Sequence, residues 1–294
     1  VASASLTGIG DDGLLKEFGP ERVRDTPISE EGFVGAAIGA AVTGLRPVVE
    51  IMYADFVANC MNQVVNFAAK MRYSSGGQVK VSLVIRMMVG HGRGHGGDHS
   101  QVPIAWFMNI PGLRLAVPST PRDAKGLLKT AIRGDSPVLF FEPHLVYRVK
   151  GSVPEGEYAL PFGKADVKRS GNDVTVVAIS AMVPRAVEAH ERLKNEGISM
   201  EVVDPMTLNP LDIETIVESV KRTNRLVTVE YSPKTGGVGA EIAALVVEKA
   251  FDYLDSPIAR VAAPDIPIPV SPPLEKMTVP SVEAIIEAVK GIIV

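Results

Sequence analysis

Three of the five histidines of this 294-residue chain lie in one glycine-rich segment, residues 90–101. His91, His95 and His99 are spaced by four, which on a helix would place them on one face as candidate metal ligands. Five of the eight residues from 90 to 97 are glycine, and this content argues against a helix. We therefore predict a binding or catalytic loop, in which a histidine can transfer protons near neutral pH. A solvent-exposed loop and a metal site are the alternatives.

Two adjacent carboxylates, Glu30 and Glu31, follow Ser29, a residue type that caps the N-terminus of helices. The dipole of the helix that they would begin favours negative charge in its first turn. Residues 32–44 are rich in glycine, which costs about 1 kcal/mol per residue in a helix relative to alanine. We expect this helix to allow another backbone to approach closely. From these residues alone, Glu30 is interpreted as a helix-start carboxylate, with a buried catalytic carboxylate as the alternative.

The other candidate motifs are weaker. Cys60 lies in an apolar pattern of helical spacing and is interpreted as a buried core thiol rather than a nucleophile. Residues 236–241 (GGVGAE) are similar to a dinucleotide-binding turn, but the third glycine of that motif is replaced, so a tight turn into a helix is favoured. Asn59 and Gln63 would share a helix with Cys60, either as surface residues or as ligand contacts.

Two blocks of alternating strands and helices must position these residues. In the first block we expect strands at 47–53, 81–86, 113–118 and 137–142, with helices at 31–44, 56–73, 100–108 and 121–133. In the second we expect strands at 174–180, 199–204, 225–231 and 258–262, with helices at 184–195, 211–221, 239–253 and 281–292. This alternation predicts the α/β class with two domains, each based on a parallel sheet.

The domain boundaries follow from a change in composition after the first block. We expect one domain over residues 1–155, a linker over 156–170 and a second domain over 171–294. Residues 263–280 hold six prolines and are expected to form an extended strap rather than a helix.

Composition excludes several classes of protein. Hydrophobic residues make up 46% of the chain, enough for a substantial core, and the formal net charge of −4 excludes a generally basic nucleic-acid binder. A single cysteine excludes an intrachain disulfide framework. No run approaches the roughly 18 apolar residues of a membrane span. Residues 1–5 lack the features of a signal peptide, so we expect a cytoplasmic protein without a membrane partner.

Strings of residues that follow one another from about Leu14 to the C-terminus resemble the beta subunits of 2-oxo acid dehydrogenase complexes. The matching strings are 18–30 (FGPERVRDTPISE), 44–52 (GLRPVVEIM), 69–77 (AKMRYSSGG), 99–101 (HSQ), 110–113 (IPGL), 118–128 (PSTPRDAKGLL), 204–212 (DPMTLNPLD) and 239–242 (GAEI). The family comprises the thiamine-diphosphate-dependent pyruvate, branched-chain 2-oxo acid and acetoin dehydrogenases. The resemblance implies a transketolase-like fold, with a pyrimidine-binding domain followed by a transketolase C-terminal domain.

The resemblance also implies roles for four residues. Glu30 matches the glutamate that hydrogen-bonds N1′ of the cofactor's aminopyrimidine, and this contact favours the tautomer that supplies the catalytic 4′-imino base. Phe56 matches the aromatic residue that packs on the same ring. Asn59 falls where many members have a glutamine that contacts the cofactor. His99 matches the active-site histidine, which interacts with the reaction intermediate and assists acyl transfer to a lipoyl group.

A partner is implied because the sequence has no Gly-Asp-Gly motif followed by asparagine, which in the family holds the magnesium diphosphate. The resemblance implies that an alpha subunit supplies it, in an α2β2 heterotetramer that passes acyl groups to a lipoyl acyltransferase component. The helix at 32–44 is the candidate subunit contact, and without alpha the chain is expected to self-associate. Some relatives bind a monovalent cation at the segment matching 131–135. Glycine replaces the usual acidic residue there, so no metal ligand is predicted.

The favoured function is oxidative decarboxylation of a 2-oxo acid, pyruvate above all, on thiamine diphosphate. Two enzymatic alternatives are the beta chain of an acetoin dehydrogenase and that of a split transketolase. A non-catalytic assembly subunit and a metallohydrolase that uses the three loop histidines are the others.

Overall fold

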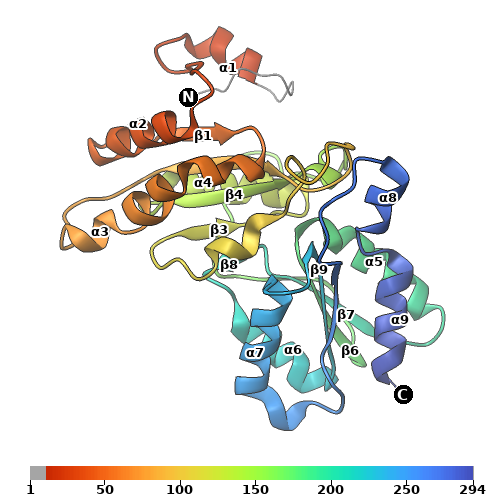
Figure 1. Cartoon of the computed structure of the whole chain (residues 1–294). Helices are drawn as coiled ribbons and strands as arrows, with labels where there is room; N and C mark the ends of the chain where they lie inside the picture. Colours follow the sequence, from red (N-terminus) through yellow and green to blue (C-terminus); the bar gives the residue numbers. More distant parts are fainter. Residues whose placement is uncertain (1–10, 294) are drawn as a thin grey trace.

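The computed structural model describes residues 11–293, and in this range the chain forms two five-stranded sheets, each covered by helices (Figure 1). The first sheet has the order β1-β2-β4-β3-β8. Its strands are β1 (Val48–Ile51), β2 (Val84–Val89), β3 (Arg114–Ala116), β4 (Val138–Pro143) and β8 (Thr207–Asn209). Neighbouring strands are parallel except β3 and β8, which are antiparallel. The parallel α/β architecture predicted from the alternating pattern is confirmed.

The two faces of the first sheet are buried against different helices. Successive side chains of a strand point to opposite faces, so Val84 and Ile85 of β2 enter different apolar clusters. Val84 packs in the cluster that includes Leu127 of α4 (Pro121–Arg133). Thr120 caps this helix, because its side chain accepts a hydrogen bond from the Asp123 amide at 3.2 Å.

The other face of the first sheet carries α2 (Glu30–Val42) and the irregular helical segments η1 (Ala54–Cys60) and η2 (Gln63–Ala68), followed by α3 (Met71–Ser74). The continuous helix predicted at 56–73 is therefore wrong. Ala54, Val57 and Cys60 are all completely buried and are spaced by three, which is the period of a 3₁₀-helix rather than an α-helix. The predicted helix at 100–108 is likewise a short 3₁₀ segment, η3 (Pro103–Phe107).

The second sheet has the order β10-β9-β6-β7-β5. Its strands are β5 (Asp166–Arg169), β6 (Val174–Ala178), β7 (Met200–Asp204), β9 (Leu226–Pro233) and β10 (Ala259–Ala263). Helices α6 (Ile213–Thr223) and α7 (Val238–Ala250) lie together on one side of it, and α5 (Val183–Lys194) and α9 (Val282–Ile293) on the other (Figure 1). A short 3₁₀ segment, η6 (Phe251–Tyr253), follows α7.

Four of the α-helices and strands were not predicted from the sequence. They are α1 (Asp11–Phe18), β5, β8 and α8 (Pro272–Met277). Helix α8 interrupts the predicted extended strap at 263–280, which is a correction. Pro272 and Pro273 stand at its first positions, where a missing backbone N–H leaves no helical hydrogen bond unmade. Strand β5 forms the last part of the segment 156–170.

A buried ionic cluster ties the two sheets together. Lys168 of β5 lies 2.9 Å from Asp123 Oδ2 of α4 and 3.4 Å from Asp204 Oδ2 of β7, and both carboxylates are fully buried. Ser119 Oγ also donates a hydrogen bond to Asp204 Oδ2 at 2.5 Å. The strings 118–128 and 204–212, which carried part of the family resemblance, thus meet at this junction.

No helix among residues 11–293 has the length and apolar character needed to span a membrane. The expectation about a signal peptide concerns residues 1–5, which lie outside the described residues.

Candidate active site

Glu30 is the first residue of α2 and is 8% exposed. Ser29 stands at the N-cap position as predicted, but its side chain makes no capping hydrogen bond. The amide of Asn59 on η1 instead donates to Glu30 Oε2 at 3.4 Å. Glu31, next in the chain, is exposed and accepts a hydrogen bond from Gln63 Nε2 at 3.1 Å. The two neighbouring carboxylates are therefore in different surroundings, and Glu30 is the buried one.

Phe56, also on η1, contacts the predicted active-site histidine. The ring centroids of Phe56 and His99 are 5.0 Å apart in an edge-to-face arrangement. Tyr53 completes this ring cluster, with centroids 5.1 Å from His99 and 5.6 Å from Phe56. His95 lies on its edge, 5.8 Å from Tyr53. Because η1 carries both Asn59 and Phe56, it connects the buried carboxylate with the histidine loop.

The histidine loop is not helical, as its glycine content predicted. Its backbone is held by a carboxylate from the second half of the chain. Glu275 of α8 accepts hydrogen bonds from the amides of Gly92 at 2.8 Å and Gly94 at 3.0 Å, and it is 3% exposed. Gly94 has a φ of +66°, and a Cβ there would lie 2.9 Å from the Val270 carbonyl oxygen. Glycine is therefore needed where the loop passes α8.

Arg93 also stabilises this loop. Its guanidinium stands over the Tyr53 ring at 4.6 Å, and its Nη2 donates to the His99 carbonyl oxygen at 2.8 Å. Asp55 accepts a hydrogen bond from the Gln101 amide at 3.1 Å. Tyr53, Asp55 and Glu275 could not be identified from the sequence, because each acts through a tertiary contact and none belongs to a recognisable motif. Arg93 lies within the predicted loop, but its role also depends on tertiary contacts.

His99 has a side-chain partner next to it in the chain. Its Nδ1 lies 3.0 Å from Asp98 Oδ1, and this hydrogen bond lowers the pKa of the exposed Asp98 carboxyl. The contact leaves the Nε2 end of the ring available to a ligand. The His99 side chain is 37% exposed, so it can reach a molecule that approaches from outside the chain.

His91 does not join the other two histidines. It is 1% exposed and packs near Tyr231 of β9, with ring centroids 6.1 Å apart. Burial lowers its pKa to about 4, so the ring is neutral at pH 7. Among the described residues, no group of three or more His, Cys, Asp or Glu side chains could hold a metal ion.

Two further sequence interpretations are confirmed. Cys60 is fully buried, its Sγ donates to the Val57 carbonyl, and burial raises its pKa to about 12, so it is a core thiol. At the start of α7, Glu230 Oε2 accepts from the Val238 amide at 3.0 Å and Oε1 from the Gly239 amide at 2.8 Å. This carboxylate fills the place that a phosphate would take at a dinucleotide turn, as expected for a tight turn into a helix.

The segment 131–135 is already occupied by side chains of the protein. Arg46 Nη1 donates to the carbonyl oxygens of Ile132 at 3.1 Å and Gly134 at 2.6 Å. Arg46 Nη2 and Lys80 Nζ both reach Asp135, at 2.9 Å and 2.6 Å. Two cationic side chains therefore already use oxygens of this segment.

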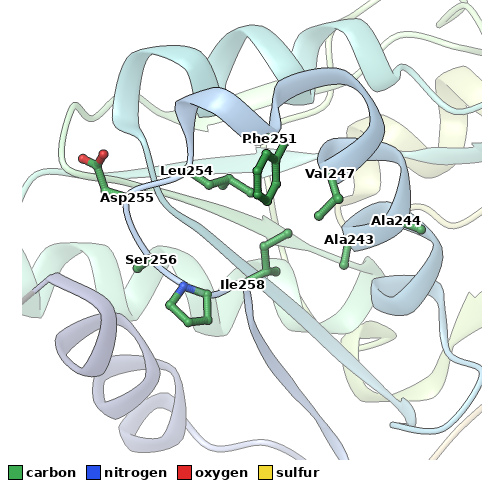
Figure 2. Close-up of a pocket in the computed structure, with 9 residues that line it drawn as sticks. Ala243, Ala244, Val247, Phe251, Leu254, Asp255, Ser256 and Ile258 are labelled. Carbon is green, nitrogen blue, oxygen red and sulfur yellow. The ribbon is translucent and has the colours of Figure 1, made fainter.

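One hollow in the surface lies away from this site. A cavity of about 650 Å³ lies on α7 and η6, where Val247, Phe251 and Ile258 form an apolar lining (Figure 2). None of the candidate catalytic residues lines it. Glu30, Asn59, Phe56 and His99 instead form a polar and aromatic surface in which Asn59 is exposed. This arrangement offers one wall of a pocket rather than an enclosed one.

The fold and this site define a transketolase-like chain with two domains. The family described as transketolase, pyrimidine binding domain, matches residues 7–150, and the family described as transketolase, C-terminal domain, matches residues 163–285. Among solved structures, a split gene transketolase described as an inactive beta4 tetramer matches with a TM-score of 0.77 and 26% identity. The match covers 93% of this chain and 85% of the other.

Curated relatives narrow the assignment. The chain is 48% identical over 274 residues to the beta subunit of acetoin:2,6-dichlorophenolindophenol oxidoreductase of Bacillus subtilis (strain 168). This match covers 93% of this chain and 80% of the relative. It is 48% identical over 282 residues to the mitochondrial pyruvate dehydrogenase E1 component subunit beta-2 of Oryza sativa subsp. japonica, covering 95% and 75%. The corresponding E1 beta subunit of Rickettsia felis (strain ATCC VR-1525 / URRWXCal2) is 47% identical over 280 residues, covering 95% and 86%. The chain therefore belongs to the family of E1 beta subunits of 2-oxo acid dehydrogenases and their acetoin-linked relatives, as the resemblance implied.

Proposed function

We propose that this chain is the beta subunit of a thiamine-diphosphate-dependent 2-oxo acid dehydrogenase that oxidatively decarboxylates pyruvate. The observation that carries the proposal is the buried Glu30 carboxylate, joined through η1 to the ring cluster of Phe56 and His99. The names of the relatives, most of which are pyruvate dehydrogenase subunits, support pyruvate as the substrate.

The residues present fit the aminopyrimidine half of thiamine diphosphate. Glu30 offers a carboxylate at the start of a helix, where it would hold a protonated ring nitrogen through a charge-assisted hydrogen bond. Phe56 offers a ring on which an aromatic ligand can pack. Asn59 donates to Glu30 and orients that carboxylate. When bound, thiamine diphosphate supplies the carbon centre that takes up the 2-oxo acid and allows its carboxylate to leave.

His99 is suited to the later transfer of the acyl group to a lipoyl sulfur. Its Nδ1 is held by Asp98, so Nε2 faces the open side of the site and can give a proton to that sulfur or receive one from it. Tyr53 and Arg93 position the loop so that this nitrogen keeps its place. Asp98 thus acts as a positioning residue for His99.

An alpha subunit completes the pocket in this proposal. The sequence lacks the Gly-Asp-Gly motif that would hold a magnesium diphosphate, and Asn59 is exposed beside the buried carboxylate. Gly39 on α2 is exposed, and a Cβ built there meets nothing within 4 Å, so this helix offers an uncovered face for a second subunit. We propose an α2β2 assembly that passes its acyl group to a lipoyl acyltransferase.

Reconstitution with a matching alpha subunit tests this function. We expect pyruvate-dependent CO₂ release and reductive acylation of a lipoyl domain only when both chains, thiamine diphosphate and magnesium are present. Decarboxylation by this chain alone would contradict the shared site. The relative from Bacillus subtilis makes acetoin oxidation the second candidate, and preferential turnover of acetoin in the same assay would replace the first.

A further inference from the structure

A second cavity, of about 400 Å³, lies behind the histidine loop. It is lined by residues of that loop and by residues 263–268, at and after the end of β10, so both halves of the chain line it. Trp106, Ile266 and Ile268 give it an apolar lining, together with four prolines. Cavities of this volume are at the small end of the range that holds organic ligands. None of Glu30, Phe56, Asn59 and His99 lines it, so this cavity is separate from the proposed active site.

The cavity is lined by two buried side chains with unpartnered polar atoms, His91 and Tyr231, whose hydroxyl lacks a hydrogen-bond partner among the described residues. His91 lines it and is 1% exposed, and neither of its ring nitrogens has a hydrogen-bond partner among the described residues. Buried polar atoms are hydrogen-bonded in the great majority of cases, because leaving one unpaired costs free energy. Because burial lowers the pKa of His91 to about 4, the neutral ring offers one N–H donor and one acceptor nitrogen at pH 7.

The charges around the cavity argue against an anionic ligand. No lysine or arginine is among the residues that line it, so nothing there would hold a phosphate or carboxylate. The one carboxylate, that of Asp265, is already used, because it accepts hydrogen bonds from the Thr235 amide at 3.0 Å and from the Thr235 hydroxyl at 2.6 Å. The aromatic side chains of Trp106 and Tyr231 favour a flat, apolar occupant.

We infer that this cavity binds a small neutral aromatic molecule that carries a hydroxyl group or a ring nitrogen, with His91 as its hydrogen-bond partner. The occupant lies between the two halves of the chain, in a cavity that neither His99 nor Tyr53 lines. This inference does not depend on the proposed function, because it concerns a different cavity and needs no cofactor.

Trp106 makes the inference directly testable. It is the only tryptophan of the chain and lines the cavity, so its fluorescence in the purified full-length chain reports an occupant without an activity assay. Phenol is the probe, and toluene is a matched control that lacks the hydroxyl. We expect a saturable change in emission with both, and an affinity for phenol about fivefold higher, since a hydrogen bond contributes about 1 kcal/mol.

Two variants separate the role of His91 from that of the apolar lining. His91→Ala should lower the affinity for phenol to that for toluene, whereas His95→Ala, in the same loop but outside the cavity, should leave both unchanged. Should His91→Ala fail to fold, His91→Gln and the comparison of the two probes in the unaltered chain still decide. Equal affinities for phenol and toluene, or no saturable change with either, would overturn the inference and indicate that water alone pairs with His91.

Discussion

Removing the charge of Glu30 while keeping its shape should abolish most of the activity of the assembled enzyme. Glu30→Gln replaces a carboxylate that is 8% exposed, so solvent screens its electrostatic interactions only weakly and their loss has a large effect. Losing one such electrostatic contact in a water-excluded active site costs about 2.7–4 kcal/mol, or a factor of about 100 to 1,000 in kcat. The measurement is the rate of CO₂ release from pyruvate by the complex reconstituted with an alpha subunit, at saturating thiamine diphosphate.

Glu31→Gln is the matched control for this experiment. Glu31 is the next residue of the same helix, but it is exposed and bonds to Gln63 rather than to Asn59. We expect its substitution to change kcat by less than about fivefold, because exposed charge contacts contribute less than about 1 kcal/mol. Should Glu30→Gln retain turnover within about twofold of the unaltered enzyme, the proposed role of this carboxylate is wrong and a non-catalytic assembly subunit becomes the better description.

Three other substitutions test the assembly and stability of the chain. Gly39→Leu should leave the isolated chain folded, because a Cβ there meets nothing within 4 Å, but should prevent assembly with the alpha subunit in size-exclusion chromatography. Lys168→Met should lower the free energy of unfolding in urea by about 3–5 kcal/mol, because it removes the cation beside the buried Asp204 and leaves the buried Asp123 only its longer contact with Arg122, at 3.6 Å. The unaltered chain should lose about 2 kcal/mol more between pH 7 and pH 5 than His91→Gln does, because the unfolded chain protonates His91 first.

Each of these expectations has an outcome that contradicts it. An alpha complex formed normally by Gly39→Leu would place the subunit contact elsewhere, and Gly39→Ala serves as the small-residue control. A loss below about 1 kcal/mol for Lys168→Met would mean that water screens the cluster. For His91, the folded-state pKa lies below that of the unfolded chain, so its contribution is present above about pH 6.5 and lost as the pH falls towards 4. Parallel pH profiles for the unaltered chain and the variant would contradict the lowered pKa.

Several of the eight predicted strands have apolar runs that are buried on both faces. Strands β2, β4, β6 and β9 are of this kind, and all four lie within a few residues of their predicted ranges. Strand β5 was missed because it is an edge strand that carries charged side chains and alternates between half-buried and exposed. The prediction of a continuous helix at 56–73 was wrong. The residues buried in its first part are spaced by three, as in the 3₁₀ segment that the structure has there.

The candidate site could be predicted from the sequence for those residues that lie in strings matching the family. Glu30, Asn59, Phe56 and His99 were all named from the sequence, and the structure links them through η1 and the histidine loop. Glu275 could not be found in this way, because it meets Gly92 from 183 residues further along the chain. No local pattern encodes such a contact, which arises only when the two sheets pack.

Strand β8 has a consequence for how the molecule folds and can be divided. It follows β7 of the second sheet, yet it completes the edge of the first one by pairing with β3. The first half of the chain, expressed by itself, would expose the β3 edge to pairing with other molecules. During synthesis, β3 can pair with β8 only after residue 209 has been made. A cut between the two halves should therefore yield a fragment that aggregates.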